Sequence, residues 1–320
     1  MTTLLVDLVA VLLLLGGLAG LSAALARRIE RAEPPEGGFL DLDRDRLHVV
    51  DTGTGRPVVL IHGLSGQMGN FTYALVDRLS RDFRVVAFDR PGSGYSTRAP
   101  GASAGIHAQA AILAKAIRAL KLEDPVIVGH SLGGAFALAL DHPDCAAALA
   151  LISPATHPMR STPSVFRGLA LLRSSVPRRV FAWTLATPIA LLARRWGTRQ
   201  VFAPEPAPPD FATRGGGLLP LRPGNIEASA ADLAAAKLPE DIESMTIRYR
   251  SLTIPVGILF GRSDPILDWR AQGEAMKQDL PTLDLEIVEG GHMLPVTQPD
   301  ACAAFIRRIA AKARTGEDLH

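Results

Sequence analysis

The residues best suited to chemistry surround a serine near the middle of the chain. Gly129-His130-Ser131-Leu132-Gly133 directly follows the apolar run 126–128 and directly precedes a stretch with helical spacing. A serine on a sharp strand-to-helix turn is held in a strained backbone conformation that lifts its Oγ clear of the sheet. The following helix directs its positive end at the same place. A bare G-x-S-x-G pattern is weak, but in this setting it predicts that Ser131 is a nucleophile.

A serine hydroxyl needs a base to take its proton, and the base needs a third group that fixes its tautomer. Among eight histidines, His292 has the position expected of the base, because it lies in a loop between the last predicted strand and the final helix. Asp264 lies in another loop, just beyond the strand that ends at Phe260, and is expected to orient His292. The chain order serine, aspartate, histidine is the one expected at the carboxyl edge of such a sheet. Asp268 is the alternative orienting acid, although its position suits the opening of the next helix.

Acyl transfer also requires two N–H donors for the oxygen that becomes negative. The backbone amide of Leu132 is one candidate, and the other is the amide of Leu64, in the turn after the apolar run 57–61. His62 and His130 are expected to shape their loops through hydrogen bonds. No two histidines lie four residues apart beside a carboxylate, so we expect no metal site.

Strands alternating with helices must position these side chains. Strand-like runs occur at 39–42, 46–52, 57–61, 84–88, 126–128, 148–153, 256–260 and 283–288. Helices are expected at 70–79, 106–120, 132–140, 226–237, 271–280 and 299–314. The alternation predicts an α/β domain with a mostly parallel sheet. It stops between 155 and 252, where we expect an insertion between two core strands.

Five motifs in this order resemble the α/β-hydrolase superfamily over residues 39–314, in particular its branch of esterases, haloperoxidase-like enzymes and carbon–carbon-bond hydrolases. The motifs are His62-Gly63, Asp89-Arg90-Pro91-Gly92-Ser93-Gly94-Tyr95-Ser96, Gly129-His130-Ser131-Leu132-Gly133-Gly134, Gly261-Arg262-Ser263-Asp264 and Gly290-Gly291-His292. The resemblance implies the α/β-hydrolase fold, with a mostly parallel eight-stranded sheet, one antiparallel strand, flanking helices and a helical cap inserted after strand 6.

The resemblance implies the same roles for the five candidate site residues. Ser131 would be the nucleophile, His292 the base and Asp264 the orienting acid, while Leu64 and Leu132 would form the oxyanion hole. Dehalogenases and epoxide hydrolases of this superfamily have an aspartate nucleophile, and Ser131 argues against both. In Asp89 to Ser96 the glycines are expected to form a tight turn, and Arg90 is expected to anchor nearby carbonyls or carboxylates.

Residues 4–26 are apolar apart from Asp7 and Ser22. This segment is long enough to cross a bilayer as a helix, which takes about 20 residues. Arg27, Arg28 and Arg31 follow, and no basic residue precedes the segment. The positive-inside rule therefore predicts a single-pass anchor with the catalytic domain in the cytoplasm. Residues 24–26 have the small-x-small form of a cleavage site, so a secreted or periplasmic protein remains the alternative.

The predicted boundaries place a membrane helix or signal anchor at 1–26, a linker at 27–38, the core at 39–154 and 253–314, the cap at 155–252 and a tail at 315–320. Residues 145–204 contain no Asp or Glu. Their eight arginines are Arg160, Arg167, Arg173, Arg178, Arg179, Arg194, Arg195 and Arg199. Two interpretations remain open: a solvated helix face, or a surface for anionic lipid, where each cation contributes about 1 kcal/mol.

Composition narrows the class of protein. The 320 residues are 48% hydrophobic and 21% charged, which excludes a disordered chain. The formal net charge of +2 gives no overall field for nucleic acid, so no nucleic-acid partner is expected. The two cysteines, Cys145 and Cys302, exclude a disulfide scaffold and are expected to be free and buried.

Together these features predict a membrane-anchored serine hydrolase that cleaves carboxylic esters through an acyl-enzyme, without an organic cofactor. The Leu-rich cap favours hydrophobic or lipid-like acyl groups. The same three residues are compatible with cleavage of thioesters, amides or carbon–carbon bonds, and with acyl transfer. A non-catalytic ligand-binding protein on the same fold is the alternative from another class.

Overall fold

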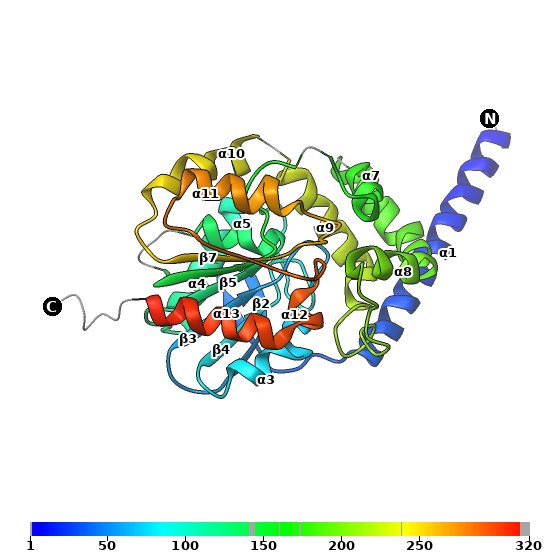
Figure 1. The fold of residues 1–320 in the computed structure, drawn as a ribbon. Coiled ribbons are helices and arrows are strands. Elements are labelled where there is room, and N and C mark those ends of the chain that lie inside the picture. Colours follow the sequence, from blue (N-terminus) through cyan, green and yellow to red (C-terminus); the bar gives the residue numbers. More distant parts are fainter. Residues whose placement is uncertain (1, 141–144, 160, 173, 238, 314–320) are drawn as a thin grey trace.

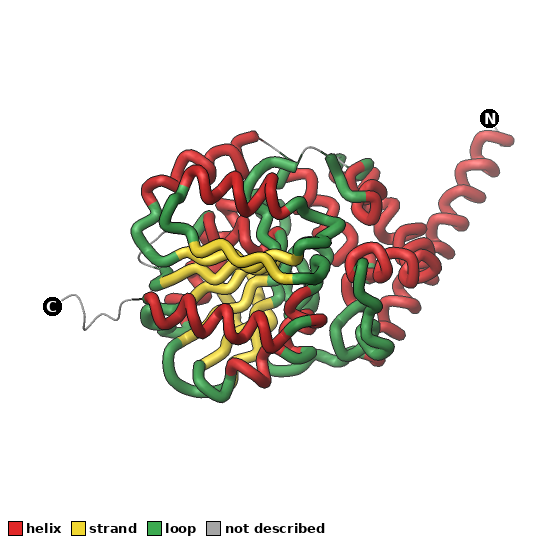
Figure 2. The backbone as a smooth tube through the Cα atoms, viewed as in Figure 1, coloured by secondary structure: helices red, strands yellow, loops and turns green. Residues whose placement is uncertain are grey.

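A single sheet of eight strands forms the centre of the molecule, with helices on both faces (Figures 1 and 2). The computed structural model describes residues 2–140, 145–159, 161–172, 174–237 and 239–313. Arg160, Arg173 and the predicted tail at 315–320 lie outside the described residues. The strand order is β1-β2-β4-β3-β5-β6-β7-β8. The strands are β1 (Gly38–Leu42), β2 (Asp45–Thr52), β3 (Pro57–Ile61), β4 (Arg84–Phe88), β5 (Val126–His130), β6 (Ala148–Ile152), β7 (Val256–Gly261) and β8 (Asp284–Val288).

The pairing pattern confirms a mostly parallel sheet. Strand β2 pairs antiparallel with both β1 and β4, and every other pair in the sheet is parallel. Strand β2 is therefore the one antiparallel strand. Because parallel strands start from the same side, their carboxyl ends meet at one edge, where the loops after β3, β5, β7 and β8 come together.

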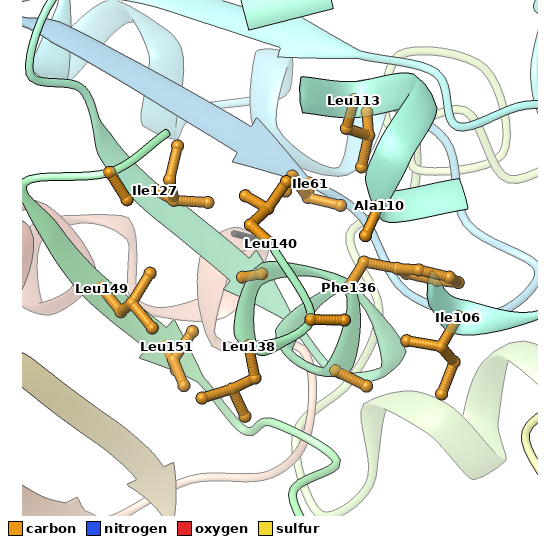
Figure 3. Packing of buried hydrophobic residues seen from close by; sticks show 14 of the residues in the cluster. Ile61, Ile106, Ala110, Leu113, Ile127, Phe136, Leu138, Leu140, Leu149 and Leu151 are labelled. Atoms are coloured by element: carbon orange, nitrogen blue, oxygen red, sulfur yellow. The ribbon is translucent and has the colours of Figure 1, made fainter. Parts of the chain in front are cut away.

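Alternate side chains of the strands fill two cores, one on each face of the sheet. Val59 and Ile61 point to the face covered by α4 (Ile106–Ala119) and α5 (Leu132–Leu138), whereas Val58 and Leu60 point to the face covered by α3 (Leu75–Leu79) and α13 (Pro299–Lys312). This is the period of two expected of a strand buried on both sides. Figure 3 shows the first core from close by, with Phe136 of α5 packed among Ile61, Ala110 and Ile106.

The remaining core helices differ from the expected ranges in detail. The helix expected at 70–79 is divided into α2 (Gly69–Thr72) and α3, because Ala74 has φ −155°, outside the helical region. The helix expected at 271–280 opens with one π-helical turn, η5 (Arg270–Glu274), before α11 (Ala275–Asp279). Before α13, α12 (Leu294–Thr297) forms a single short turn.

The insertion between β6 and β7 is helical, as expected. Its elements are η1 (Ser164–Phe166), α6 (Arg167–Ala170), α7 (Ser175–Phe181), η2 (Ala182–Ala186), α8 (Thr187–Phe202), η3 (Leu219–Leu221), α9 (Pro223–Ala235), α10 (Pro239–Arg248) and η4 (Tyr249–Ser251). The predicted cap extends too far along the chain. Ile242, Met245 and Tyr249, at helical spacing, belong to the core around α4 and α5, so α10 and η4 pack on the helices of the core. We therefore call the insertion up to α9 the cap.

The amino-terminal helix α1 (Thr2–Ala32) is longer than the predicted anchor. Residues 27–32, expected to be part of a linker, are helical because they pack against the cap: Ile29 is buried and Glu30 forms an ion pair with Arg222 at 2.7 Å. Ser22 Oγ donates a hydrogen bond to the carbonyl of Thr184 in η2 at 2.6 Å. Within the described residues, α1 is the helix long and apolar enough to cross a membrane. Its amino-terminal half stands away from the body (Figure 1).

A buried carboxyl group follows α1 directly. Glu33 is 7% exposed, and its Oε1 accepts a hydrogen bond from the backbone N–H of Leu218 at 3.0 Å. Burial raises the pKa of Glu33 from its ordinary 4.5 to about 7, although the N–H groups of Leu218 and Leu219 act in the opposite direction. The folded protein therefore binds a proton here at a pH where the unfolded chain has released it.

Replacing Glu33 by glutamine is expected to remove a pH dependence of stability. Between pH 4.5 and about 7 the folded wild type holds more protons than the unfolded chain, so its stability falls as pH rises. The glutamine side chain keeps an acceptor for Leu218 and does not titrate. We expect the variant to exceed wild type by roughly 1–3 kcal/mol at pH 8 and to match it near pH 5. Thermal unfolding against pH measures this, with the exposed Glu36→Gln as control; parallel curves for Glu33→Gln and wild type would contradict it.

Candidate active site

Ser131 occupies a strained turn between β5 and α5, as the sequence predicts. Its backbone has φ 55° and ψ −125°, which is unfavourable for a residue with a side chain. The turn is held by the N–H of Ser131, which donates to Ile152 at 3.0 Å, and by its carbonyl, which accepts from Gly134 and Ala155, each at 2.9 Å. A Cβ at Gly133 would lie 2.1 Å from the carbonyl oxygen of Ile61, so only glycine fits there. The close packing fixes the position of the serine.

His292 and Asp264 form a hydrogen-bonded pair on neighbouring loops, after β8 and β7. The distance between His292 Nδ1 and Asp264 Oδ2 is 2.7 Å, and both side chains are almost fully buried. The other carboxylate oxygen of Asp264 accepts hydrogen bonds from the N–H groups of Ile266 and Leu267 at 2.8 and 3.0 Å. Because Nδ1 donates to a carboxylate, Nε2 of His292 is left as a proton acceptor.

Asp268, the alternative orienting acid, has a different position. Its Oδ1 accepts a hydrogen bond from the backbone N–H of Arg270 at 3.0 Å, and its side chain is exposed. It therefore caps the turn that opens the following helix. The structure pairs His292 with Asp264.

Ser131, His292 and Leu64 line one cavity of about 700 Å³ under the cap. The loop that carries Leu64 lies against the serine, because a Cβ added at Gly63 would be 2.7 Å from Ser131 Cβ. Leu132 is the first residue of α5, so its N–H has no acceptor within the helix. Four of the five predicted residues therefore lie at the serine turn or at the cavity: Ser131, Leu132, Leu64 and His292. The fifth, Asp264, is hydrogen-bonded to His292.

Two further histidines hold these loops, as expected. His130 Nε2 donates to the carbonyl of His292 at 3.0 Å, and its ring lies 4.9 Å from that of His292. His62 Nδ1 donates to the carbonyl of Gly63 at 2.9 Å, and its Nε2 accepts from the N–H of Arg90 at 2.9 Å. Burial lowers the pKa of both His62 and His130 to about 3, so both remain neutral near pH 7.

A buried ion pair ties the cap to the core. Arg90 anchors nearby carbonyls and a carboxylate, as expected, but the sequence analysis did not identify Asp232 as its partner. Arg90 donates to the carbonyls of His62 and Gly63, each at 3.0 Å, and to Asp232 of α9 at 2.9 Å. Arg98 binds the other oxygen of Asp232 at 2.8 Å. Asp232 is the only acidic residue within 228–238, an Ala-rich stretch, and this isolated carboxylate was the available signal.

The rest of the cavity wall is mostly apolar and comes from the cap. The large apolar side chains that line it include Leu169, Leu172, Phe181, Ile189, Val201 and Trp196. Among the described residues, no group of three or more His, Cys, Asp or Glu is arranged to hold a metal ion. Cys145 and Cys302 are both buried thiols, as expected.

An eight-stranded, mostly parallel sheet with a serine on a strained turn between β5 and α5 is the architecture of an alpha/beta hydrolase. Residues 56–299 match the family model described as alpha/beta hydrolase fold, and the chain belongs to this family. This confirms the superfamily resemblance seen in the motifs.

Individual relatives agree on the fold. A thermophilic esterase from Thermogutta terrifontis has 24% identity and a TM-score of 0.70, over 86% of this chain and 99% of that chain. A bacterial membrane phospholipase A has 22% identity and a TM-score of 0.65, over 97% of this chain and 99% of that chain. The dihydrolipoyllysine-residue acetyltransferase component of the acetoin cleaving system of Cupriavidus necator is 37% identical over 120 residues, which are 36% of this chain and 31% of that protein. This chain therefore spans about a third of that relative.

Proposed function

We propose that the protein is a membrane-anchored serine hydrolase that cleaves carboxylic esters with hydrophobic acyl groups. The observation that carries the proposal is the pairing of His292 Nδ1 with Asp264 at 2.7 Å, beside a cavity that His292 shares with Ser131. This pairing leaves Nε2 of the imidazole as the base that a serine nucleophile requires.

The proposed reaction has two halves. Ser131 Oγ attacks the ester carbonyl while His292 Nε2 takes its proton, and the amides of Leu64 and Leu132 stabilise the oxyanion. His292 then gives the proton to the leaving alcohol, which departs and leaves an acyl-enzyme. In the second half His292 activates water, which releases the acid and regenerates Ser131. Asp264 stabilises the imidazolium in both halves without taking the proton.

The cavity supports a preference for hydrophobic acyl groups. Its volume of about 700 Å³ lies within the range of small-molecule sites, and its cap side is built mainly from Leu, Ile, Phe and Trp side chains. The polar groups Ser131 and His292 lie on its core side. We therefore expect the ester bond to lie at the core and the acyl chain to extend toward the cap.

The packing of α1 supports an anchor that is retained. Cleavage after Ala26 would remove Ser22, whose side chain is buried against η2, and would detach the helix from Ile29 and Glu30. The likeness to the membrane phospholipase A leaves out 3% of this chain, fewer residues than α1 contains, so it extends into α1. The arginines after the apolar segment favour a cytoplasmic catalytic domain.

A fluorophosphonate probe and a series of p-nitrophenyl esters, both used on the full chain in detergent, test this function. We expect the probe to modify the peptide that contains Ser131, as identified by mass spectrometry, and esters of longer acyl chains to be hydrolysed faster than the acetate. Absence of labelling, or labelling at another serine, would contradict the nucleophile. Labelling without turnover of any ester would instead favour thioesters or amides as substrates.

A further inference from the structure

Exposed apolar side chains concentrate on one part of the cap. We call them the apolar rim: Leu171, Val176, Val180, Trp183, Leu185, Ile189, Leu192 and Trp196. They come from the end of α6 and from α7, η2 and α8. Among the described residues, the large exposed apolar side chains outside α1 and the rim are Phe39 and Ile247. A concentration of exposed apolar side chains on neighbouring helices points to interaction with another molecule or with a membrane.

The apolar rim lies beside α1, at the level where a membrane span would end. Ser22 lies 18 positions after Leu4. At 1.5 Å per residue the helix rises about 27 Å between them, close to the thickness of the hydrocarbon core. Ser22 is hydrogen-bonded to Thr184, whose neighbours Trp183 and Leu185 belong to the rim. In Figure 1, α8 lies next to α1, and η2 also packs against α1. Trp183 would therefore be at the membrane interface, where tryptophan is enriched.

The mouth of the cavity is part of the same surface. Leu171, Ile189 and Trp196 are exposed and also line the cavity that contains Ser131. An opening into water bordered by such side chains leaves apolar area hydrated, at a cost of about 25 cal/mol per Å². An opening into hydrocarbon removes that cost. The apolar border therefore fits a membrane better than bulk water.

The charges on these helices suit a lipid headgroup region. Arg179, Arg194 and Arg195 are exposed on α7 and α8, and residues 145–204 contain no carboxylate side chain. Long arginine side chains can place their apolar stems along the rim while the guanidinium groups reach the headgroups. Near an anionic leaflet each of them contributes about 1 kcal/mol.

We propose that the apolar rim docks into the same lipid leaflet that α1 enters, so that the cavity opens to the bilayer. The substrates are then amphiphilic esters with long acyl chains, such as glycerolipids, which enter the cavity from the membrane with the acyl chain in the cap. The ester bond itself rests on the proposed function, whereas the docking rests on the cap and on the position of α1 beside it.

Fluorescence of Trp196 tests the docking without any enzymatic assay. The chain has three tryptophans. The full chain carrying Trp183→Phe and Trp269→Phe retains only Trp196, and it is reconstituted in vesicles of phosphatidylcholine and phosphatidylglycerol. We expect lipids brominated on their acyl chains to quench more than half of the Trp196 emission. Emission that is unchanged by brominated lipid would overturn the docking.

A matched pair of charge substitutions tests the route of the substrate. Leu192 and Ile247 are 87% and 81% exposed, and neither lines the cavity. In vesicles, Leu192→Asp is expected to lower hydrolysis of a long-chain ester dispersed in the bilayer by about tenfold, and to leave water-soluble p-nitrophenyl butyrate within twofold. Ile247→Asp should change neither rate. Equal effects of the two variants on the bilayer ester would overturn the proposal. Quenching of Trp196 without turnover of either ester would support the docking and contradict the proposed function.

Discussion

Replacing Ser131 by alanine is expected to lower kcat for ester hydrolysis by about 10⁴- to 10⁶-fold, because the acyl-enzyme can no longer form. The hydrogen bonds that hold the turn involve only the backbone of Ser131, and alanine has the same Cβ at this strained φ, so the fold should be kept. Initial rates on a p-nitrophenyl ester measure the loss, and thermal unfolding checks the fold.

Ser153 offers a matched control. It also follows a strand, has a positive φ of 42° and is fully buried, but it does not line the cavity. Its Oγ has no hydrogen-bond partner among the described residues, so Ser153→Ala should cost little stability. We expect its activity to stay within about threefold of wild type. Activity of Ser131→Ala above about 1% of wild type would exclude Ser131 as the nucleophile.

Replacing Asp264 by asparagine is expected to reduce kcat by about 10⁴-fold with little change in KM. Oδ1 already accepts from the N–H groups of Ile266 and Leu267, so the asparagine oxygen keeps that place and Nδ2 faces His292. An N–H donor there makes Nδ1 of His292 the acceptor. The ring proton then resides on Nε2, where it prevents His292 from taking the proton of Ser131.

The neighbouring aspartate provides the control for this variant. Asp268 lies in the segment that follows the same strand, and its contact is the backbone N–H of Arg270. Asp268→Asn keeps an oxygen for that contact and should retain activity within about twofold. If both variants lost the same activity, or if Asp264→Asn lost less than tenfold, Asp264 would not be the orienting acid. Measuring kcat and KM of the two variants and of wild type at one pH tests this prediction.

Local patterns predicted the sheet and the positions of the candidate residues because both depend on short-range chemistry. The apolar run before Ser131 and the helical spacing after it indicate a strand-to-helix turn, so the placement of Ser131 was visible in about ten residues. His292 and Asp264 were found in the same way, from loops that follow strands. The catalytic roles of these residues remain predictions, for which the two variants above are the test.

Contacts between distant segments were not predictable from such patterns. Arg90 and Asp232 are 142 positions apart, and although Asp232 is isolated in an Ala-rich stretch, its neighbours in the sequence do not identify Arg90 as its partner. The extension of α1 through residues 27–32 depends on the cap surface that Ile29 and Glu30 meet, including Arg222. The packing of α10 on the core depends on its stripe of Ile242, Met245 and Tyr249, which its place in an insertion did not indicate.

The ion pair between Arg90 and Asp232 divides the cap into two parts that can change at different rates during evolution. Loss of one partner leaves a buried charge unpaired, which typically costs 3–5 kcal/mol, so α9 is constrained to retain its aspartate. The described residues of α6 to α8 make no such bond to Arg90. New substrate specificities can therefore arise by exchange of α6 to α8, in nature or in chimeras, while α9 continues to join each new wall to the loop that carries Leu64.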